Sequence, residues 1–178
     1  MPSMSDDRFA RSVVLVATHS ADGAMGFMLN RKVASPTFLD ILDELDLVME
    51  AARQRRQEQQ VAVFSGGPVE QGRGFVIHSL DYGSPGTSRI KDLAGVTATL
   101  DVLRALSGPH PPRKSVMLLG YAGWSAGQLE QEIAANGWLT VPATEALLFD
   151  TPWKDLYEAG LAALGISEAL LSSEAGRA

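Results

Sequence analysis

The sequence predicts one α/β-type domain built on a mixed sheet. Its 178 residues fall within the usual length of a single domain, and 46% hydrophobic with 20% charged residues is an ordinary globular composition. Apolar segments follow one another at hairpin-like spacing in the first half and alternate with helical patterns in the second. This irregular alternation favours a mixed sheet over a doubly wound parallel one.

Short apolar runs rich in β-branched residues predict the strands of the first half. The expected strands are residues 13–18, 27–30, 61–64 and 75–78, with turns at 22–23 and 72–74 and a surface loop over 82–87. Ser35 is expected to cap a helix with Pro36 at its first position, because Phe38, Ile41 and Leu42 recur at helical spacing.

The second half alternates helical and extended patterns. A helix capped by Thr97 or Thr99 is expected to end at Gly108-Pro109, and a strand should follow over 116–119. A second helix should open with a Ser125/Gln128 capping box, end at Asn136-Gly137 and lead into a strand over 138–141. Helical turns are expected over 142–148, and a last long helix should start at Thr151-Pro152, with Gly165 just past its end. The polar stretch 50–60 has no apolar stripe and predicts a frayed helix end or a mobile loop.

Composition argues against several classes of function. The formal net charge of −6 works against binding to DNA or anionic lipid, whose phosphates select for Lys and Arg. The one basic cluster, Arg53, Arg55 and Arg56, is diluted by Glu50 and Glu58, so we interpret it as a solvated loop rather than a nucleic-acid contact. Without Cys there is no disulfide framework, thiolate zinc site or cysteine nucleophile.

The sequence also predicts a cytoplasmic protein with no membrane partner. Absence of Cys fits a reducing cytosol, and residues 1–11 lack the pattern of a secretory signal. The longest apolar runs are about half a dozen residues, against the roughly 18–20 that cross a bilayer.

A serine motif gives the most direct hint of catalysis. Residues 123–127 (GWSAG) match the G-x-S-x-G nucleophile elbow between a predicted strand and a predicted helix. In that fold the histidine base follows the serine, but the last histidine here, His110, precedes it. We therefore interpret Ser125 as a helix cap and predict no catalytic residue.

Two glycine-rich turns predict an anion site. No phosphate-binding or dinucleotide-binding loop is present, so no cofactor is expected. Gly66 and Gly67 could still offer backbone N–H groups to an anion, with Arg73 supplying charge. The alternative is that turn geometry alone requires these glycines.

The histidines extend this candidate site. Strict alternation puts His19 on the face of Val13 and Leu15, while His78 and Asn30 end strands of similar sequence. If the strands are neighbours, these three side chains converge near the glycine turns. The alternative is that each histidine is half-buried and bonded to a loop carbonyl. Two histidines without a carboxylate motif make a poor metal site, so no metal is predicted.

Several stretches together resemble the AlgH/YqgE family of bacterial proteins. They are residues 7–14 (DRFARSVV), 22–26 (DGAMG), 30–31 (NR), 66–69 (GGPV), 73–78 (RGFVIH), 119–124 (LGYAGW), 127–139 and 147–150 (LLFD). The resemblance covers nearly the whole chain and implies an α+β fold in which mixed, bent sheets form a pseudo-barrel with helices packed outside. It implies a regulatory role proposed in alginate production and no agreed set of catalytic residues.

The chain departs from the family pattern in two places. Family members usually carry an apolar strand before the position of Met1, so this first strand is expected to be missing here. The arginine-rich stretch 50–60 looks longer than is usual in the family.

Three functions follow from these observations. The leading hypothesis is a non-catalytic regulatory module that binds a small anionic ligand or a protein partner. The second is an enzyme of unrecognised type that uses His78 or His19 as general acid/base. The third is a DNA-binding transcriptional regulator, which the acidic balance disfavours.

Overall fold

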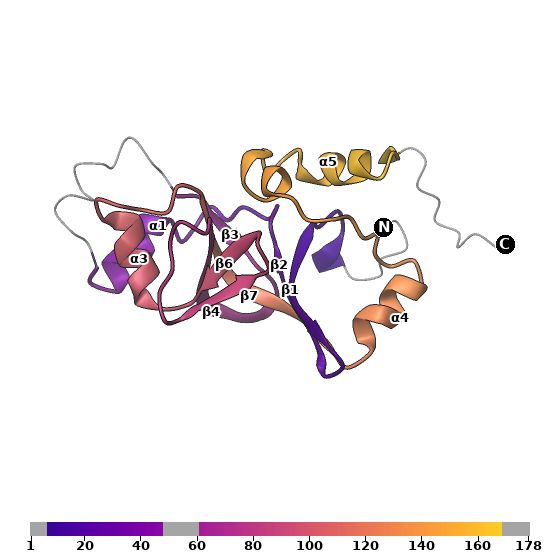
Figure 1. Cartoon of the computed structure of the whole chain (residues 1–178), viewed down its shortest axis with the longest axis horizontal. Coiled ribbons are helices and arrows are strands. Elements are labelled where there is room, and N and C mark those ends of the chain that lie inside the picture. Colours follow the sequence, from indigo (N-terminus) through magenta and orange to yellow (C-terminus); the bar gives the residue numbers. More distant parts are fainter. Residues whose placement is uncertain (1–6, 48–60, 169–178) are drawn as a thin grey trace.

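The computed structural model describes residues 7–47 and 61–168 (Figure 1). The fold is α+β, and its strands form a bent sheet that nearly closes into a barrel with helices outside. This confirms the fold that the family resemblance implied. The loop expected over 50–60 and the arginine cluster within it lie outside the described residues.

The sheet follows the order β1-β2-β7-β4-β6-β5, with β3 paired to β7. The strands are β1 (Val14–Ser20), β2 (Gly23–Met28), β3 (Val63–Ser65), β4 (Val69–His78), β5 (Thr87–Ile90), β6 (Ala94–Thr97) and β7 (Ser115–Ser125). Neighbours along this path are antiparallel, whereas β3 runs parallel to β7. The sheet is therefore mixed, as predicted.

Strand β7 bends the sheet by changing partners along its length. Its first half pairs with β3 and β4, and its last residues pair with β2. Gly120 lies between the two halves with φ +72°, and a Cβ there would come within 2.6 Å of the Gly67 carbonyl oxygen. Only glycine combines that backbone angle with such a close approach.

The helices cover the sheet at three places (Figure 1). They are η1 (Asp7–Phe9), α1 (Phe38–Glu44), α3 (Leu100–Ser107), α4 (Gln128–Ala134), the π-helical turn η2 (Ala146–Asp150) and α5 (Leu156–Ala163). The interior cluster around Phe27, Phe75 and Leu118 also receives Leu148 and Leu156, from η2 and α5. A second cluster packs beneath α1 and α3, and a third packs beneath α4.

Helix boundaries differ from the prediction where caps were misjudged. The N-cap of α1 is Thr37 rather than Ser35: Thr37 Oγ1 accepts from the Asp40 N–H, and Asp40 Oδ2 accepts from the Thr37 N–H at 2.7 Å. The Ser35-Pro36 peptide bond is cis. Helix α5 begins at Leu156 rather than Pro152, while Gly165 follows its end as predicted.

Strand boundaries differ more. Residues 72–74 lie inside β4 instead of forming a turn, because β4 and β7 pair with a register shift between Val69 and Gly74. Strand β7 runs on to Ser125 instead of ending at 119, β2 starts at Gly23, and β5 and β6 were not predicted. Residues 138–141 form no strand. Ser125 is the last residue of β7, and the N-cap of α4 is Gly127, with φ +73°. Of the two hydrogen bonds of the predicted capping box, only the one from the Ser125 N–H to Gln128 Oε1 forms, at 3.0 Å.

Candidate functional site

His19 lies on the face of the β1–β2 hairpin that α4 covers. The pairing of β1 with β2 skips Ala17, and this bulge reverses the side chains that follow, so the prediction that His19 shares the face of Leu15 is wrong. His19 instead faces Ala24, which belongs to the cluster beneath α4. Its Nε2 lies 2.6 Å from Glu130 Oε1 of α4.

The His19–Glu130 pair is a hydrogen-bonded contact at the surface. The two side chains are 44% and 52% exposed, so the pair contributes little to stability. The Glu130 backbone N–H lowers the pKa of that carboxyl, and the hydrogen bond with His19 lowers it further.

His78 is a fully buried structural side chain. Nδ1 lies 3.0 Å from the Ser79 carbonyl, to which it must donate, and Nε2 lies 2.9 Å from Thr97 Oγ1. Thr97 Oγ1 is in turn 2.7 Å from Thr87 Oγ1. A Cβ at Gly95 would meet His78 Cε1 at 2.4 Å, so the glycine makes room for the ring. The ring therefore has both nitrogens occupied and no solvent exposure.

Asn30 joins the N-terminal segment to the hairpin. Its Oδ1 accepts from the Val13 N–H at 3.0 Å, and its Nδ2 donates to the Arg11 carbonyl at 2.9 Å. Val13 and His19 are six residues apart, which is about 20 Å along a strand, so Asn30 and His19 lie at opposite ends of β1. His78, at the end of β4, bonds to neither of them. The structure therefore does not bring these three side chains together.

Gly66 and Gly67 serve close backbone packing. The Gly66 N–H donates to the Leu119 carbonyl at 2.7 Å, so this N–H is already used. A Cβ at Gly67 would lie 2.1 Å from the Tyr121 carbonyl carbon. Arg73 pairs with Glu70 at 3.0 Å, and its guanidinium lies 5.0 Å from the Phe75 ring centre. Ligand binding by these residues stays a prediction.

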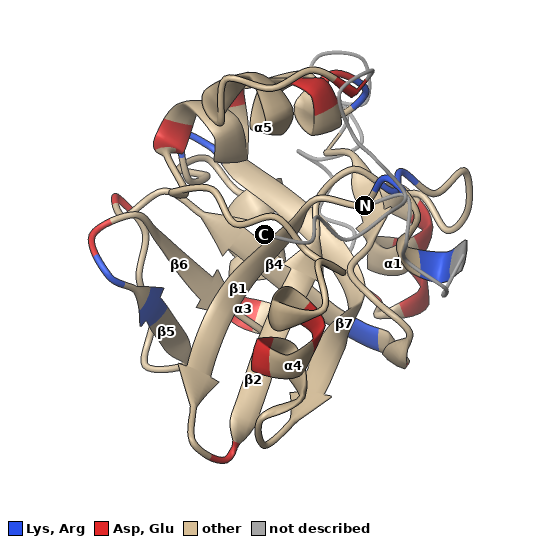
Figure 2. Ribbon diagram, turned by 90° about the vertical axis from the view of Figure 1, so that its right-hand side faces the viewer, with Lys and Arg blue, Asp and Glu red and all other residues tan. Residues whose placement is uncertain are grey.

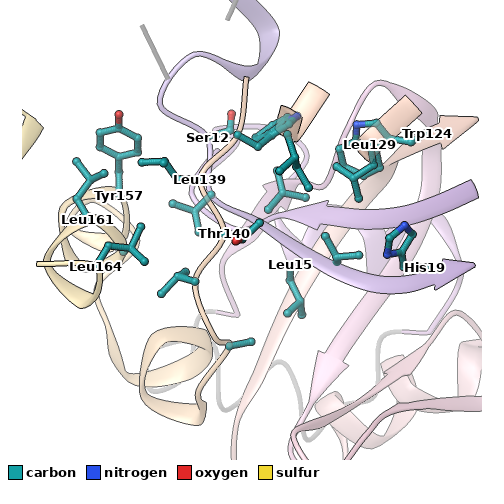
Figure 3. A pocket seen from close by; sticks show the side chains of 18 residues that line it. Ser12, Leu15, His19, Trp124, Leu129, Leu139, Thr140, Tyr157, Leu161 and Leu164 are labelled. Atoms are coloured by element: carbon teal, nitrogen blue, oxygen red, sulfur yellow. The ribbon is translucent and has the colours of Figure 1, made fainter. Parts of the chain in front are cut away.

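An apolar groove, here called the edge groove, runs along the outer edge of β1 (Figure 3). Its volume is about 390 Å³, within the range of ligand-sized pockets. Its lining comes from β1 and the two residues before it, from the end of β7, from α4, from the extended segment 138–143, and from α5 and the residue after it. The residues that matter below are Val14, Leu15, Val16, Trp124, Trp138, Leu139, Leu161 and Leu164.

The groove reaches both faces of the sheet. Val13 and Leu15 pack with the interior cluster, which Leu156 of α5 joins. Val14 packs with the cluster beneath α4, which also holds Trp138. Consecutive residues of a strand point to opposite faces, so a groove lined by all of them must open onto the strand's edge.

Few polar groups face the edge groove. His19 lies at one end, and Tyr157 lies at the other with Arg11 at 4.6 Å from its ring centre. Burial and the Glu168 carboxylate raise the pKa of the Tyr157 hydroxyl, which Arg11 partly offsets. Glu132 accepts hydrogen bonds from both Trp124 Nε1 and Trp138 Nε1, which fixes the aromatic wall.

A second cavity of about 670 Å³ lies beside α1 and α3. Its cations are Lys32, Arg113 and Lys114. Lys114 Nζ lies 2.7 Å from Asp150 and 2.9 Å from Glu145, so two carboxylates already neutralise it. We take the edge groove as the candidate site because three exposed large apolar side chains line it, namely Val16, Leu139 and Leu164.

Sequence reasoning missed the groove residues outside β1. Tyr157, Leu161 and Leu164 recur at helical spacing, a signal that predicts burial in the core rather than a groove wall. In residues 7–47 and 61–168, no three His, Asp or Glu side chains gather where they could hold a metal ion. Within the same ranges, every helix is too short or too polar to cross a bilayer.

Comparison with known proteins finds one set of relatives. The family model described as AlgH-like (DUF179) matches residues 1–169. A UPF0301 protein of Rhizobium etli (strain CIAT 652) is 48% identical over 180 residues, covering 100% of this chain and 89% of the relative. One from Rhizobium meliloti (strain 1021) is 49% identical with the same coverage.

Two solved structures share the fold. The solution structure of the AlgH protein from Pseudomonas aeruginosa has a TM-score of 0.79 and 38% identity, covering 100% of this chain and 92% of that one. The crystal structure of a protein from Corynebacterium diphtheriae has a TM-score of 0.62 and 21% identity, covering 90% and 81% of the two chains. The second likeness concerns the fold alone.

Proposed function

The chain belongs to the AlgH-like family, and from that premise we propose that it is a non-catalytic binding module that recognises a protein partner at the edge groove and acts in regulation. The family membership confirms the resemblance found in the sequence. The names of these relatives state no activity, so the proposal rests on the groove.

Exposed apolar side chains carry the proposal. Among the described residues, six large apolar side chains are more than a third exposed. Three of them, Val16, Leu139 and Leu164, line the edge groove and are 39%, 42% and 37% exposed. Apolar side chains gathered in one groove are typical of a surface that a partner covers.

The contacts of the predicted polar site residues argue against the alternatives, namely binding of a small anion and general acid/base catalysis. Arg73 already pairs with Glu70 and the Gly66 N–H with a carbonyl, which weakens the case for a small anion there. General acid/base work requires a group within reach of a substrate, and His78 has no exposed surface. His19 does reach the groove but is held by Glu130.

The proposal is tested with matched leucine variants. Leu139, in the groove, and Leu100, outside it, are 42% and 43% exposed, so both are replaced by Gln. A partner captured by the full chain in native cells would be identified, purified and titrated against both variants. Fully burying a leucine is worth about 1.5–3 kcal/mol, and only the exposed 42% of Leu139 remains to be covered, so the partner would gain about 0.6–1.3 kcal/mol there. Leu139→Gln should therefore weaken binding about 3- to 10-fold, while Leu100→Gln changes it less than about twofold.

A second pair of matched leucine variants repeats the test at another position of the groove. Leu164 in the groove and Leu80 outside it are both 37% exposed. If Leu139→Gln and Leu164→Gln both leave the affinity equal to that of their controls, the partner does not use the groove and the proposal fails.

A further inference from the structure

Helix α5 has a glycine in its interior, at a position that lines the edge groove. In the described part of the chain, Gly160 is the only glycine that lies inside a helix. Glycine destabilises a helix interior relative to alanine, because its backbone loses more conformational freedom on folding. The same helix carries alanine at positions 159, 162 and 163, so glycine at 160 requires a reason elsewhere in the fold.

The usual structural reasons for a glycine do not apply at Gly160. Its φ is not in the left-handed region, unlike that of Gly165, which follows the helix at φ +71°. Apart from the helix's own backbone and the chain neighbours, no described atom lies within 4 Å of the position that a Cβ would take. Neither backbone conformation nor close packing of the described chain therefore requires a glycine here.

Gly160 nevertheless lies on the side of α5 that faces the body of the protein. An α-helix turns by about 100° per residue, so Gly160 lies between Leu156 and Leu161 when α5 is viewed down its axis. Both leucines are buried, with 3% and 6% of their surface exposed. Leu161 and Leu164 extend from α5 along the same groove (Figure 3). The groove side of α5 thus has open space between its apolar side chains.

A larger residue at position 160 would occupy part of the groove. The groove volume is about 390 Å³, whereas an apolar cavity of roughly 150 Å³ already holds a benzene molecule. A leucine at this position therefore has room to lie in the groove beside Leu161 and Leu164. With glycine, that volume stays free.

We propose that Gly160 is a specificity-determining residue of the edge groove, because it keeps the groove open beside α5 for a bulky apolar side chain of the partner. This inference rests on the proposed function and specifies one contact within it. The partner's side chain packs against the helix backbone at Gly160 and against Leu161 and Leu164. Any larger residue at position 160 takes the same volume and excludes it.

The thermal stability of the full chain tests whether this space is open. Gly160→Ala should raise the Tm by about 1–4 °C, because alanine favours the helix and its Cβ meets no described atom. Gly160→Leu should be at least as stable as Gly160→Ala, because its side chain covers apolar groove surface. A Gly160→Ala chain less stable than the parent would mean that residues of the chain itself occupy the space, which overturns the inference.

Ala162→Leu is the matched control on the same helix. Ala162 is exposed and lies on the opposite side of α5, as does Glu158; the acidic residues of α5 are red in Figure 2. The added side chain in this control cannot enter the groove. Its Tm should therefore stay within about 2 °C of the parent value.

Binding of 1-anilinonaphthalene-8-sulfonate, a dye that fluoresces on exposed apolar surface, measures how much of the groove is free. Gly160→Leu should raise the Kd for the dye at least about fivefold, whereas Ala162→Leu should leave it within about twofold of the parent value. A purely structural role of Gly160 would change the Tm and leave the dye affinity unchanged. Equal affinity in the parent and Gly160→Leu, or no dye binding to the parent, overturns the inference.

The purified partner separates this inference from the proposed function. Gly160→Ala should weaken partner binding about 5- to 100-fold although the variant is more stable, because an added methyl group overpacks a close contact. If Leu139→Gln and Leu164→Gln weaken binding but the two Gly160 variants do not, the proposed function stands and this inference fails. If none of these groove variants weakens binding, both fail.

Discussion

The buried hydroxyl of Thr97 offers a direct test of the structural role assigned to His78. Thr97→Val keeps the branched shape of the side chain and removes the hydroxyl. That oxygen lies 2.9 Å from His78 Nε2 and 2.7 Å from Thr87 Oγ1, and Thr97 is fully buried. The substitution therefore removes two hydrogen bonds and leaves His78 Nε2 without its partner.

The expected loss follows from these contacts. Each hydrogen bond contributes about 0.5–1.5 kcal/mol net, and a buried polar atom left unpaired costs about 1–3 kcal/mol. Since the contributions overlap, the free energy of unfolding should fall by about 2–3 kcal/mol. For a chain of this size that lowers the Tm by roughly 5–10 °C.

Urea denaturation at pH 7 measures this loss, with Thr99→Val as the control. Thr99 is the exposed N-cap of α3, and its side chain makes no capping hydrogen bond, so this control should stay within about 0.5 kcal/mol of the parent chain. A Thr97→Val chain as stable as the parent would refute the reasoning, because His78 would then not depend on the hydroxyl. The histidine would have to be reconsidered as a group with a chemical role.

Two further predictions concern helix capping and pH. Thr37→Ala should lower the free energy of unfolding by about 1 kcal/mol, because Thr37 Oγ1 caps α1, whereas Thr99→Ala should have a smaller effect; urea denaturation of both variants compares them. Hydrogen bonds with Asp150, then with Glu145, raise the pKa of Lys114 above its ordinary 10.5. A raised folded-state pKa stabilises the chain fully below pH 10.5, and the contribution is lost as pH rises through the folded value. Lys114→Gln should therefore lower the denaturation midpoint at pH 7 and 9, and the difference from the parent chain should shrink as the pH rises past 10.5. Lys91→Gln, at a position with no ion pair among the described residues, should follow the parent throughout. A Lys114→Gln deficit that does not shrink at alkaline pH would contradict this.

Local signals predicted the parts of the fold that depend on neighbours in the chain. The mixed sheet and the stops of α3 and α5 at Gly108 and Gly165 are confirmed, because glycine at a helix end acts within a few residues. The cap of α1 was placed two residues early because Ser35-Pro36 and the Thr37/Asp40 box compete as start signals, and only the second forms both hydrogen bonds.

Signals that depend on pairing were misread. Residues 72–74 have the composition of a turn, yet they lie inside β4, whose pairing with β7 breaks off after Val69 and resumes at Gly74. The apolar run 138–141 has the composition of a strand, yet no neighbouring strand pairs with it in the described chain. Whether a segment joins a sheet depends on which backbone lies beside it.

The candidate site likewise combines features set by local sequence signals with features set by tertiary contacts. The sequence by itself determined the mixed sheet and the apolar nature of β1, because these follow from residue type and local spacing. Its motifs also determined the family, and that resemblance implied the α+β fold. Only the tertiary structure decided that a bulge at Ala17 turns His19 toward α4, and that Val14, Trp124 and Leu161 line one groove. Trp124 of β7 and Leu161 of α5 are more than 100 positions from β1 in the sequence. A periodicity within a short window of the sequence cannot predict which distant side chains share a surface.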